Sequence, residues 1–293
     1  MKDEIPLKSV FNAYVLILKA FINVLAGIYN SNNVDDIKSY QVVILKRIYK
    51  SLSTIEVMLS QCSDPISSYG LLRIILDSVC AYCFIYDNAN GDEVAFRHYL
   101  YLLDGCSKFN ELCSLELTNN TIISETDNMR HKKNAKLSIN DMQKIQDGIE
   151  RLLLNHHYMS KSPIIARKII KAKDWKYKSI ESDDDKNYYD WKGIYKKVGC
   201  NQQMSDFVSK YLSQFVHGLF LSNARNPNSI AHYSLIYDML VTLTIILIKT
   251  LFKVFDNDNI SKKWIEGMNF EEIVNNKGIN SKDILDYYLA KVK

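Results

Sequence analysis

The sequence predicts an all-α fold, a multi-helix bundle of about seven main helices. Only 10 Gly and 4 Pro occur among 293 residues, too few for the many tight turns of a β-sandwich or barrel. Apolar residues form 47% of the chain and recur at the three- and four-residue spacing of a helix face. No sustained strand-like alternation of apolar and polar residues and no internal repeat is present.

Helical periodicity places the expected elements of the N-terminal half. Residues 7–29 and 35–61 each carry apolar side chains at helical spacing, and a run of Asn and Ser separates the two stretches. A further helix is expected over residues 92–117. Residues 118–138 are polar and without pattern, which predicts a loop or insertion, and a helix over residues 139–158 follows.

The C-terminal half is expected to combine a surface segment with further helices. Residues 160–190 are strongly charged and predict a surface excursion, whereas residues 206–221 and 230–255 return to helical spacing. We therefore expect one bundle domain over residues 1–255, with this segment and the polar stretch described above as insertions. Two short helices in residues 256–293 are expected to pack on the bundle or to flank it.

The helix expected over residues 65–87 is apolar nearly all round, which favours a position in the middle of the bundle. Asp64 suits its N-cap, and Pro65 suits its first turn because no backbone donor is needed there. The same helix carries Arg73 and Asp77, which lie four residues apart and share one face. Buried charges need polar partners. The pair therefore indicates either a structural polar network or a ligand site.

A second polar feature lies in the segment Ser213-Gln214-Phe215-Val216-His217-Gly218. Ser213 precedes His217 by four residues, so the two side chains share a helix face. A histidine among apolar neighbours is either a core residue with a satisfied hydrogen bond or part of a polar cluster. Both interpretations remain open from the sequence.

Three stretches of the chain follow one another in the order of motifs found in a known helical family. They are Leu72-Arg73-Ile74-Ile75-Leu76-Asp77, Phe96-Arg97-His98-Tyr99, and the stretch from Trp191-Lys192-Gly193 to Ser213-Gln214-Phe215-Val216-His217-Gly218. Over about residues 40–250 the chain resembles the bacterial domain-of-unknown-function family 5677. The resemblance implies an all-helical fold, no established activity, and a polar cluster of Arg73, Asp77, Ser213 and His217. Asp77 stands where the family more often has Glu, so its carboxylate extends less far from the helix toward the rest of the cluster.

A third pattern occurs in Arg225-Asn226-Pro227-Asn228-Ser229-Ile230-Ala231-His232. An Arg followed by a polar residue and later by a His is similar to the Arg-x(4–6)-His motif of HEPN ribonucleases. The resemblance implies catalytic roles for Arg225, Asn226 and His232, no metal, and a site shared across a two-fold dimer. His can move the proton of the ribose 2′-hydroxyl or of the leaving oxygen, while Arg offsets charge at phosphorus. The alternative is an ordinary helix start, capped by an Asn or Ser of the same segment.

Charge and composition exclude several function classes. The net charge is +4, from 37 basic and 33 acidic residues mixed along the chain, unlike the concentrated basic face of a dedicated nucleic-acid binder. No Gly-rich phosphate loop, Gly-x-Ser-x-Gly elbow or His-Glu-x-x-His helix is present. The adjacent His156 and His157 would point about 100° apart on a helix. The six cysteines lie mostly in apolar helical segments, so the sequence predicts no metal and no cofactor.

The chain is expected to be cytoplasmic and to stay out of the membrane. The most apolar window, Met239–Ile248, has ten residues between Asp238 and Lys249 and falls short of the ~18–20 that a spanning helix needs. The first residues are mixed in charge and do not resemble a secretory signal. Free thiols suit a reducing cytosol.

Three functions remain open from the sequence. The leading expectation is a helical protein with a buried Arg/Asp/His cluster, associated with antiphage defence or a toxin system. The first alternative is a metal-independent HEPN-like ribonuclease, which uses Arg225 and His232 to cut RNA in a homodimer. The second alternative is a non-enzymatic bundle that binds or scaffolds a partner.

Overall fold

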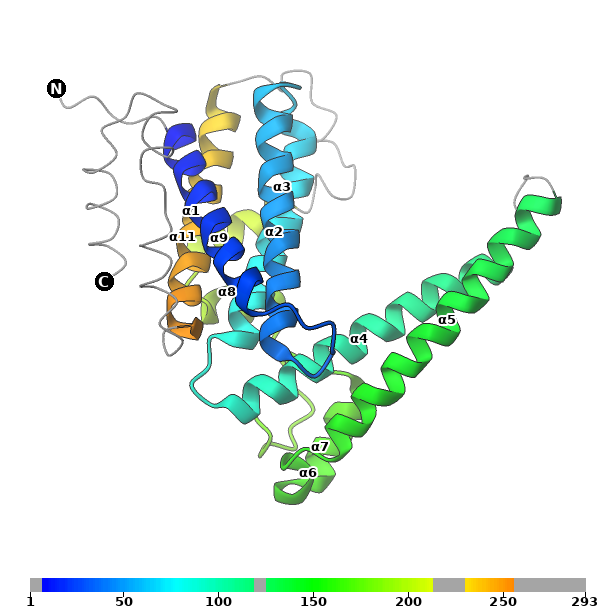
Figure 1. The fold of residues 1–293 in the computed structure, drawn as a ribbon. Coiled ribbons are helices and arrows are strands. Elements are labelled where there is room, and N and C mark those ends of the chain that lie inside the picture. Colours follow the sequence, from blue (N-terminus) through cyan, green and yellow to red (C-terminus); the bar gives the residue numbers. More distant parts are fainter. Residues whose placement is uncertain (1–6, 119–124, 213–229, 256–293) are drawn as a thin grey trace. The chain divides into compact units, whose positions relative to one another are not determined.

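The computed structural model describes residues 7–118, 125–212 and 230–255 (Figure 1). In chain order the elements are α1 (Leu7–Ile28), α2 (Ile37–Ser60), α3 (Pro65–Tyr86), α4 (Gly91–Thr118), α5 (Glu125–Leu154), α6 (Tyr158–Lys161), α7 (Pro163–Ala172), α8 (Trp191–Lys197), α9 (Gln202–Phe207), the π-helix η1 (Val208–Leu212) and α11 (Ile230–Phe255). No strand occurs among the described residues, so the predicted all-α fold is confirmed. Six helices have 22 or more residues, and the short helices α6 to α9 raise the number of described α-helices to ten, above the predicted seven.

The described residues divide into two compact units. The first contains the described parts of Met1–Asn32, Lys38–Asp87 and Trp191–Lys293, so α8, α9, η1 and α11 pack with the first three helices. The second contains Asn33–Ile37 and Asn88–Asp190, which include α4 to α7. The expected single bundle over residues 1–255 stays a prediction.

Helix α3 of the first unit is covered over most of its circumference. The Asp64 side chain accepts a hydrogen bond from the Ser67 amide at 3.0 Å, and Pro65 occupies the first turn, as the sequence predicts. Helices α8 and α11 and the π-helix η1 pack against α3. Tyr82 donates from its hydroxyl to Gln41 Oε1 on α2 at 2.8 Å. The apolar pattern of α3 thus corresponds to a helix with neighbours on several sides.

Helices α4 and α5 of the second unit pack along each other as an antiparallel hairpin (Figure 1). The loop predicted over residues 118–138 is wrong for residues 125–138, because these form the first half of α5. The stretch contains no Gly or Pro, and Ala135 is buried within it. A mostly polar sequence is therefore held as a helix by packing and not by a wide apolar face.

The segment over residues 173–190 has little regular structure but is not only a surface excursion. Trp175 and Tyr177 are buried, which corrects the prediction that the whole charged stretch lies on the surface. The side-chain amide of Asn187 links two parts of the segment, since it donates to the carbonyl oxygen of Ser179 at 2.6 Å. Most charged residues of the segment are exposed, as is Tyr188, while Trp175 and Tyr177 enter the core.

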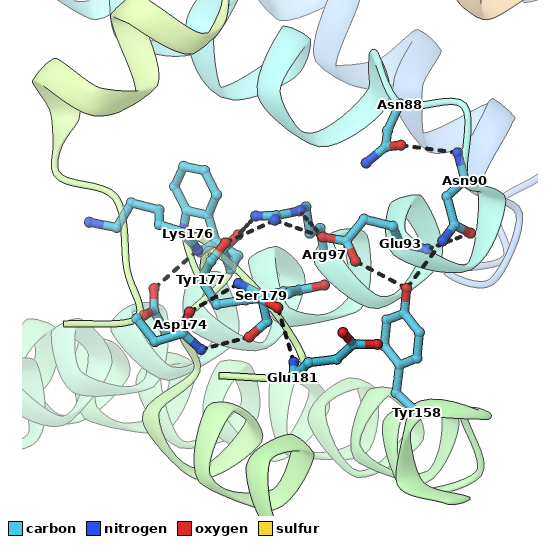
Figure 2. Close-up of polar contacts among 12 residues, drawn as sticks. Asn88, Asn90, Glu93, Arg97, Tyr158, Asp174, Lys176, Tyr177, Ser179 and Glu181 are labelled. Atoms are coloured by element: carbon cyan, nitrogen blue, oxygen red, sulfur yellow. Dashed lines mark hydrogen bonds and ion pairs between the residues drawn. The ribbon is translucent and has the colours of Figure 1, made fainter. Parts of the chain in front are cut away.

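Arg97 on α4 holds this segment in place (Figure 2). Its side chain is 6% exposed, and its Nε donates to Glu93 Oε1 at 2.7 Å. Its terminal nitrogens donate to the carbonyl oxygens of Trp175 at 2.9 Å and Tyr177 at 2.8 Å. The Tyr158 hydroxyl donates to the second oxygen of Glu93 at 3.0 Å. The buried ion pair therefore has partners on both its cation and its anion, which is the condition for tolerating its desolvation.

Replacing Arg97 with Ala is expected to lower the free energy of unfolding by about 3–5 kcal/mol, because Glu93 then stays buried without its cation. Urea unfolding at neutral pH measures the change. Lys108→Ala is the matched control on the same helix, since it breaks the exposed ion pair with Asp104 and should cost less than about 1 kcal/mol. An Arg97→Ala protein as stable as this control would show that the network contributes little.

His98, the next residue of α4, is completely buried, and its Nε2 lies 3.4 Å from the carbonyl oxygen of Val34. Burial lowers the pKa of His98 to about 4. An unfolded histidine titrates near ~6.5. The neutral ring therefore contributes stability that is fully present above pH ~6.5 and is lost as the pH falls toward 4.

Between pH 7.5 and pH 5, the wild type should lose about 2 kcal/mol more unfolding free energy than His98→Gln, which keeps a polar group beside Val34 but does not titrate. Urea unfolding of both proteins at the two pH values gives the difference. Equal losses in the two proteins would mean that His98 takes up its proton as easily in the folded as in the unfolded chain.

Three described helices are long and apolar enough to cross a membrane by length and composition: Leu7–Ile28, Pro65–Tyr86 and Ala231–Phe255. The shares of their apolar windows buried inside the protein are 33%, 67% and 61%, respectively. Most of the apolar surface of α3 and α11 is thus covered by protein, and α1 has the smallest buried share. The ten-residue window found in the sequence is shorter than these spans because a few polar residues interrupt each helix. The absence of membrane contact stays a prediction.

Candidate functional site

One face of α3 carries a row of polar side chains in the first unit. Tyr69, Arg73 and Asp77 follow one another at intervals of four residues, so they lie along one side of the helix. Each makes a hydrogen bond to the C-terminal part of the chain. These three residues, together with Tyr195 and His232, are called the α3 cluster below.

Tyr69 holds His232 at one end of the α3 cluster. His232 lies in the first turn of α11, and its Nδ1 is 2.7 Å from the Tyr69 hydroxyl oxygen. The two rings meet edge to face with centroids 5.6 Å apart, and Tyr211 meets Tyr69 in the same manner at 5.6 Å. Burial, and next the neighbouring Tyr211 hydroxyl, raise the pKa of Tyr69, so its phenol keeps its proton at neutral pH. Within the described part of the chain no hydrogen bond reaches His232 Nε2.

Arg73 and Asp77 form an ion pair at the other end of the α3 cluster. Arg73 Nε donates to Asp77 Oδ2 at 2.9 Å, and Arg73 also donates to the carbonyl oxygen of Val208 at 3.3 Å. The Tyr195 hydroxyl donates to Asp77 Oδ1 at 2.5 Å. Burial, and next the hydrogen bond to Asp77, raise the pKa of Tyr195. Both carboxylate oxygens of Asp77 therefore have a donor, and Arg73 fastens η1 to α3.

The ion pair is less buried than the apolar sequence of α3 predicts. The side chains of Arg73 and Asp77 are 19% and 29% exposed, respectively, so both retain some contact with water. The apolar pattern is interrupted on this face, where Ile74 is also exposed. The pair lies at the edge of the packed region and not at its centre, and partial hydration reduces its desolvation cost.

The structure describes three of the seven predicted site residues. It brings Arg73 and Asp77 together and places His232 on Tyr69, one helical turn from Arg73. Tyr69 is not among the residues predicted from the sequence. Its position four residues before Arg73 places it on the same helix face and could have indicated it. Tyr195 gave no such signal, because its role depends on the packing of α8 on α3. The remaining predicted residues lie outside the described part of the chain: Ser213, His217, Arg225 and Asn226.

Cys80 and Cys83 of α3 are both buried free thiols. Cys80 Sγ lies 3.8 Å from the Sγ of Cys200, which follows α8 in the chain. Burial raises the pKa of Cys83 to about 12, so its thiol stays protonated at neutral pH. The contact between Cys80 and Cys200 belongs to the packing of α8 against α3.

A separate group of potential metal ligands occurs in the second unit. Asp92 lies in the first turn of α4, and His156 and His157 follow the end of α5 at Leu154. The ligand atoms of these three residues lie within 4.8 Å of one another. The helical geometry expected for the two histidines is not observed, because the helix ends before them.

Comparison of the chain with protein-family models, with curated proteins and with solved structures finds no match. The resemblances that the short motifs carry therefore stay predictions. The geometry of the α3 cluster is the basis for assigning a function.

Proposed function

We propose that the chain is a metal-independent ribonuclease of the HEPN type, in which His232 transfers a proton during RNA cleavage. The observation that supports the proposal is the 2.7 Å hydrogen bond between Tyr69 and His232 Nδ1. A histidine that transfers protons needs one ring nitrogen anchored and the other available. Tyr69 is completely buried, so it is suited to fix the orientation of the ring.

The proposed reaction moves a phosphodiester bond within the RNA. The ribose 2′-hydroxyl loses its proton and its oxygen attacks the phosphorus, while the bond to the 5′-oxygen breaks and that oxygen takes up a proton. His232 Nε2 carries out one of these two proton transfers. By the sequence motif, Arg225 offsets the negative charge at phosphorus and Asn226 assists it. The products are a 2′,3′-cyclic phosphate and a 5′-hydroxyl.

The ion pair of Arg73 and Asp77 supports this arrangement from one turn away. Arg73 bonds to Val208, the first residue of η1, and η1 carries Tyr211 against the ring of Tyr69. π-Helices are rare in proteins, and those that occur often lie at functional sites. In this proposal the pair positions η1 and does not touch RNA. The enzyme acts as a cytoplasmic homodimer, in the antiphage-defence or toxin setting that is expected from the sequence.

A second candidate function is a binding or scaffolding module. Leu112, Leu115 and Met129 on the hairpin of α4 and α5 are 59%, 66% and 66% exposed, respectively. Large exposed apolar side chains favour contact with another protein. This function needs no free ring nitrogen at His232, so an RNA cleavage assay separates the two candidates.

The ribonuclease proposal predicts that the purified chain cleaves single-stranded RNA and leaves 2′,3′-cyclic phosphate ends. His232→Ala should lower the cleavage rate by roughly 100-fold or more, because one proton transfer loses its carrier. Tyr69→Phe should lower it by roughly 10-fold, because the ring loses its anchor but keeps Nε2. Gel analysis of an end-labelled RNA measures the rates, and excess EDTA should leave them unchanged.

His131→Ala is the matched control, since His131 is an exposed histidine on α5 in the other unit. It should cleave RNA at the wild-type rate. An RNA that stays intact with the wild type, or a His232→Ala variant as active as the wild type, would contradict the proposal. Loss of cleavage on adding EDTA would contradict its metal independence.

A further inference from the structure

The start of α4 and the end of α5 bring together three side chains that bind transition metals. Asp92 is separated from His156 and His157 by more than sixty residues in the chain. Their ligand atoms nevertheless lie within 4.8 Å of one another. His157 Nδ1 is 3.4 Å from Asp92 Oδ2. A small rotation of either side chain would let both atoms bind one ion.

The end of α5 makes this convergence possible. The helix ends at Leu154, and the His156 amide donates to the carbonyl oxygen of Leu153 at 3.2 Å in a tight turn. The two imidazole rings are 5.2 Å apart at their centroids and inclined by 38°. Adjacent histidines on a regular helix would point about 100° apart. The turn therefore directs both rings toward the start of α4.

His156 is held in position by its neighbours. Its ring centroid lies 5.1 Å from that of Phe96 and 4.8 Å from that of Tyr158. The Tyr158 backbone amide donates to His156 Nδ1 at 3.3 Å. A histidine that ligates a metal donates its other ring N–H, so an ion at Nδ1 would take the place of this contact and leave the proton on Nε2. Asp92 and His157 are exposed, so their side chains are free to close on an ion.

We propose that Asp92, His156 and His157 form a binding site for a divalent transition-metal ion of the zinc class. Two imidazoles and one carboxylate are a ligand set that such ions prefer, whereas calcium and magnesium favour oxygen ligands alone. Closure of the two exposed side chains brings three ligands to about 2.0–2.2 Å from the ion and leaves a fourth position for water or a substrate. The neighbouring Glu93 is not a ligand, because Arg97 and Tyr158 occupy its carboxylate.

The site is independent of the proposed ribonuclease function. All three ligands belong to the second unit, while Tyr69 and His232 belong to the first. Removing the metal ligands is therefore expected to leave RNA cleavage unchanged, and removing His232 is expected to leave metal binding unchanged. The failure of one proposal does not decide the other.

Titration of the full chain with ZnCl₂ in a calorimeter tests the site. The wild type should bind one Zn²⁺ ion at this site. Asp92→Asn and His157→Ala should each weaken this binding by roughly 10-fold or more, because losses of that size follow even when a residue behind a ligand is removed. Both substituted residues are exposed, so the variants should keep the fold, which circular dichroism checks. His131→Ala, which removes an exposed histidine of α5, should bind Zn²⁺ as the wild type does.

Co²⁺ gives a second readout of the same site. The wild type should show the visible absorption bands of Co²⁺ with nitrogen ligands, and His157→Ala should lose them. The absence of saturable Zn²⁺ binding by the wild type would overturn the proposal. Zn²⁺ binding that is unchanged in both Asp92→Asn and His157→Ala would overturn it as well, since the ion would then lie elsewhere.

Discussion

The covering of α3 by other helices is the constraint on which the first unit depends. A helix with neighbours on several sides gives up water along most of its length, so the polar side chains on its covered part need protein partners. Tyr69, Arg73 and Asp77 receive these partners from residues more than 110 positions further along the chain. The packing of α8, η1 and α11 on α3 is therefore specified by hydrogen bonds as well as by apolar contact. The proposed catalytic histidine takes its orientation from the same requirement.

The Arg73–Asp77 and Arg97–Glu93 ion pairs satisfy this requirement to different degrees. Arg97 is 6% exposed and has Glu93 and two backbone carbonyls as partners, so it acts as a fixed point for the segment that crosses it. Arg73 is 19% exposed and bonds to one carbonyl besides Asp77. A partly hydrated pair pays a smaller desolvation cost than a buried one and gains less from its ion pairing. Arg73 therefore holds η1 with fewer contacts than Arg97 uses to hold its segment.

The parts of the fold that the sequence predicts are those in which local signals agree. Helix α3 is expected at residues 65–87 and runs over Pro65–Tyr86, because its cap, its proline and its apolar pattern coincide. Residues 125–138 were expected as a loop because a polar helix that packs mainly through Ala135 shows little periodicity. At the turn after α5, His156 packs against Phe96, which lies sixty residues earlier. No pattern in the sequence near His156 predicts that contact.

The candidate site was predictable only in part for the same reason. Arg73 and Asp77 share a face by their spacing, so their pairing follows from the sequence alone. Their partial exposure depends on where α8 and η1 pack, and spacing carries no information on that. The bond between Tyr69 and His232 joins residues 163 positions apart, and no pattern in either segment points to the other.

A double-mutant cycle on Tyr69 and His232 measures the interaction free energy of the two side chains in the folded chain, and with it whether α3 holds the histidine. The unfolding free energies of the wild type, Tyr69→Phe, His232→Ala and the double variant supply the four values. Phe keeps the ring and removes only the hydroxyl. We expect a coupling of about 1 kcal/mol, the net contribution of one hydrogen bond. A coupling of zero would contradict it, since His232 would then be held by something other than α3.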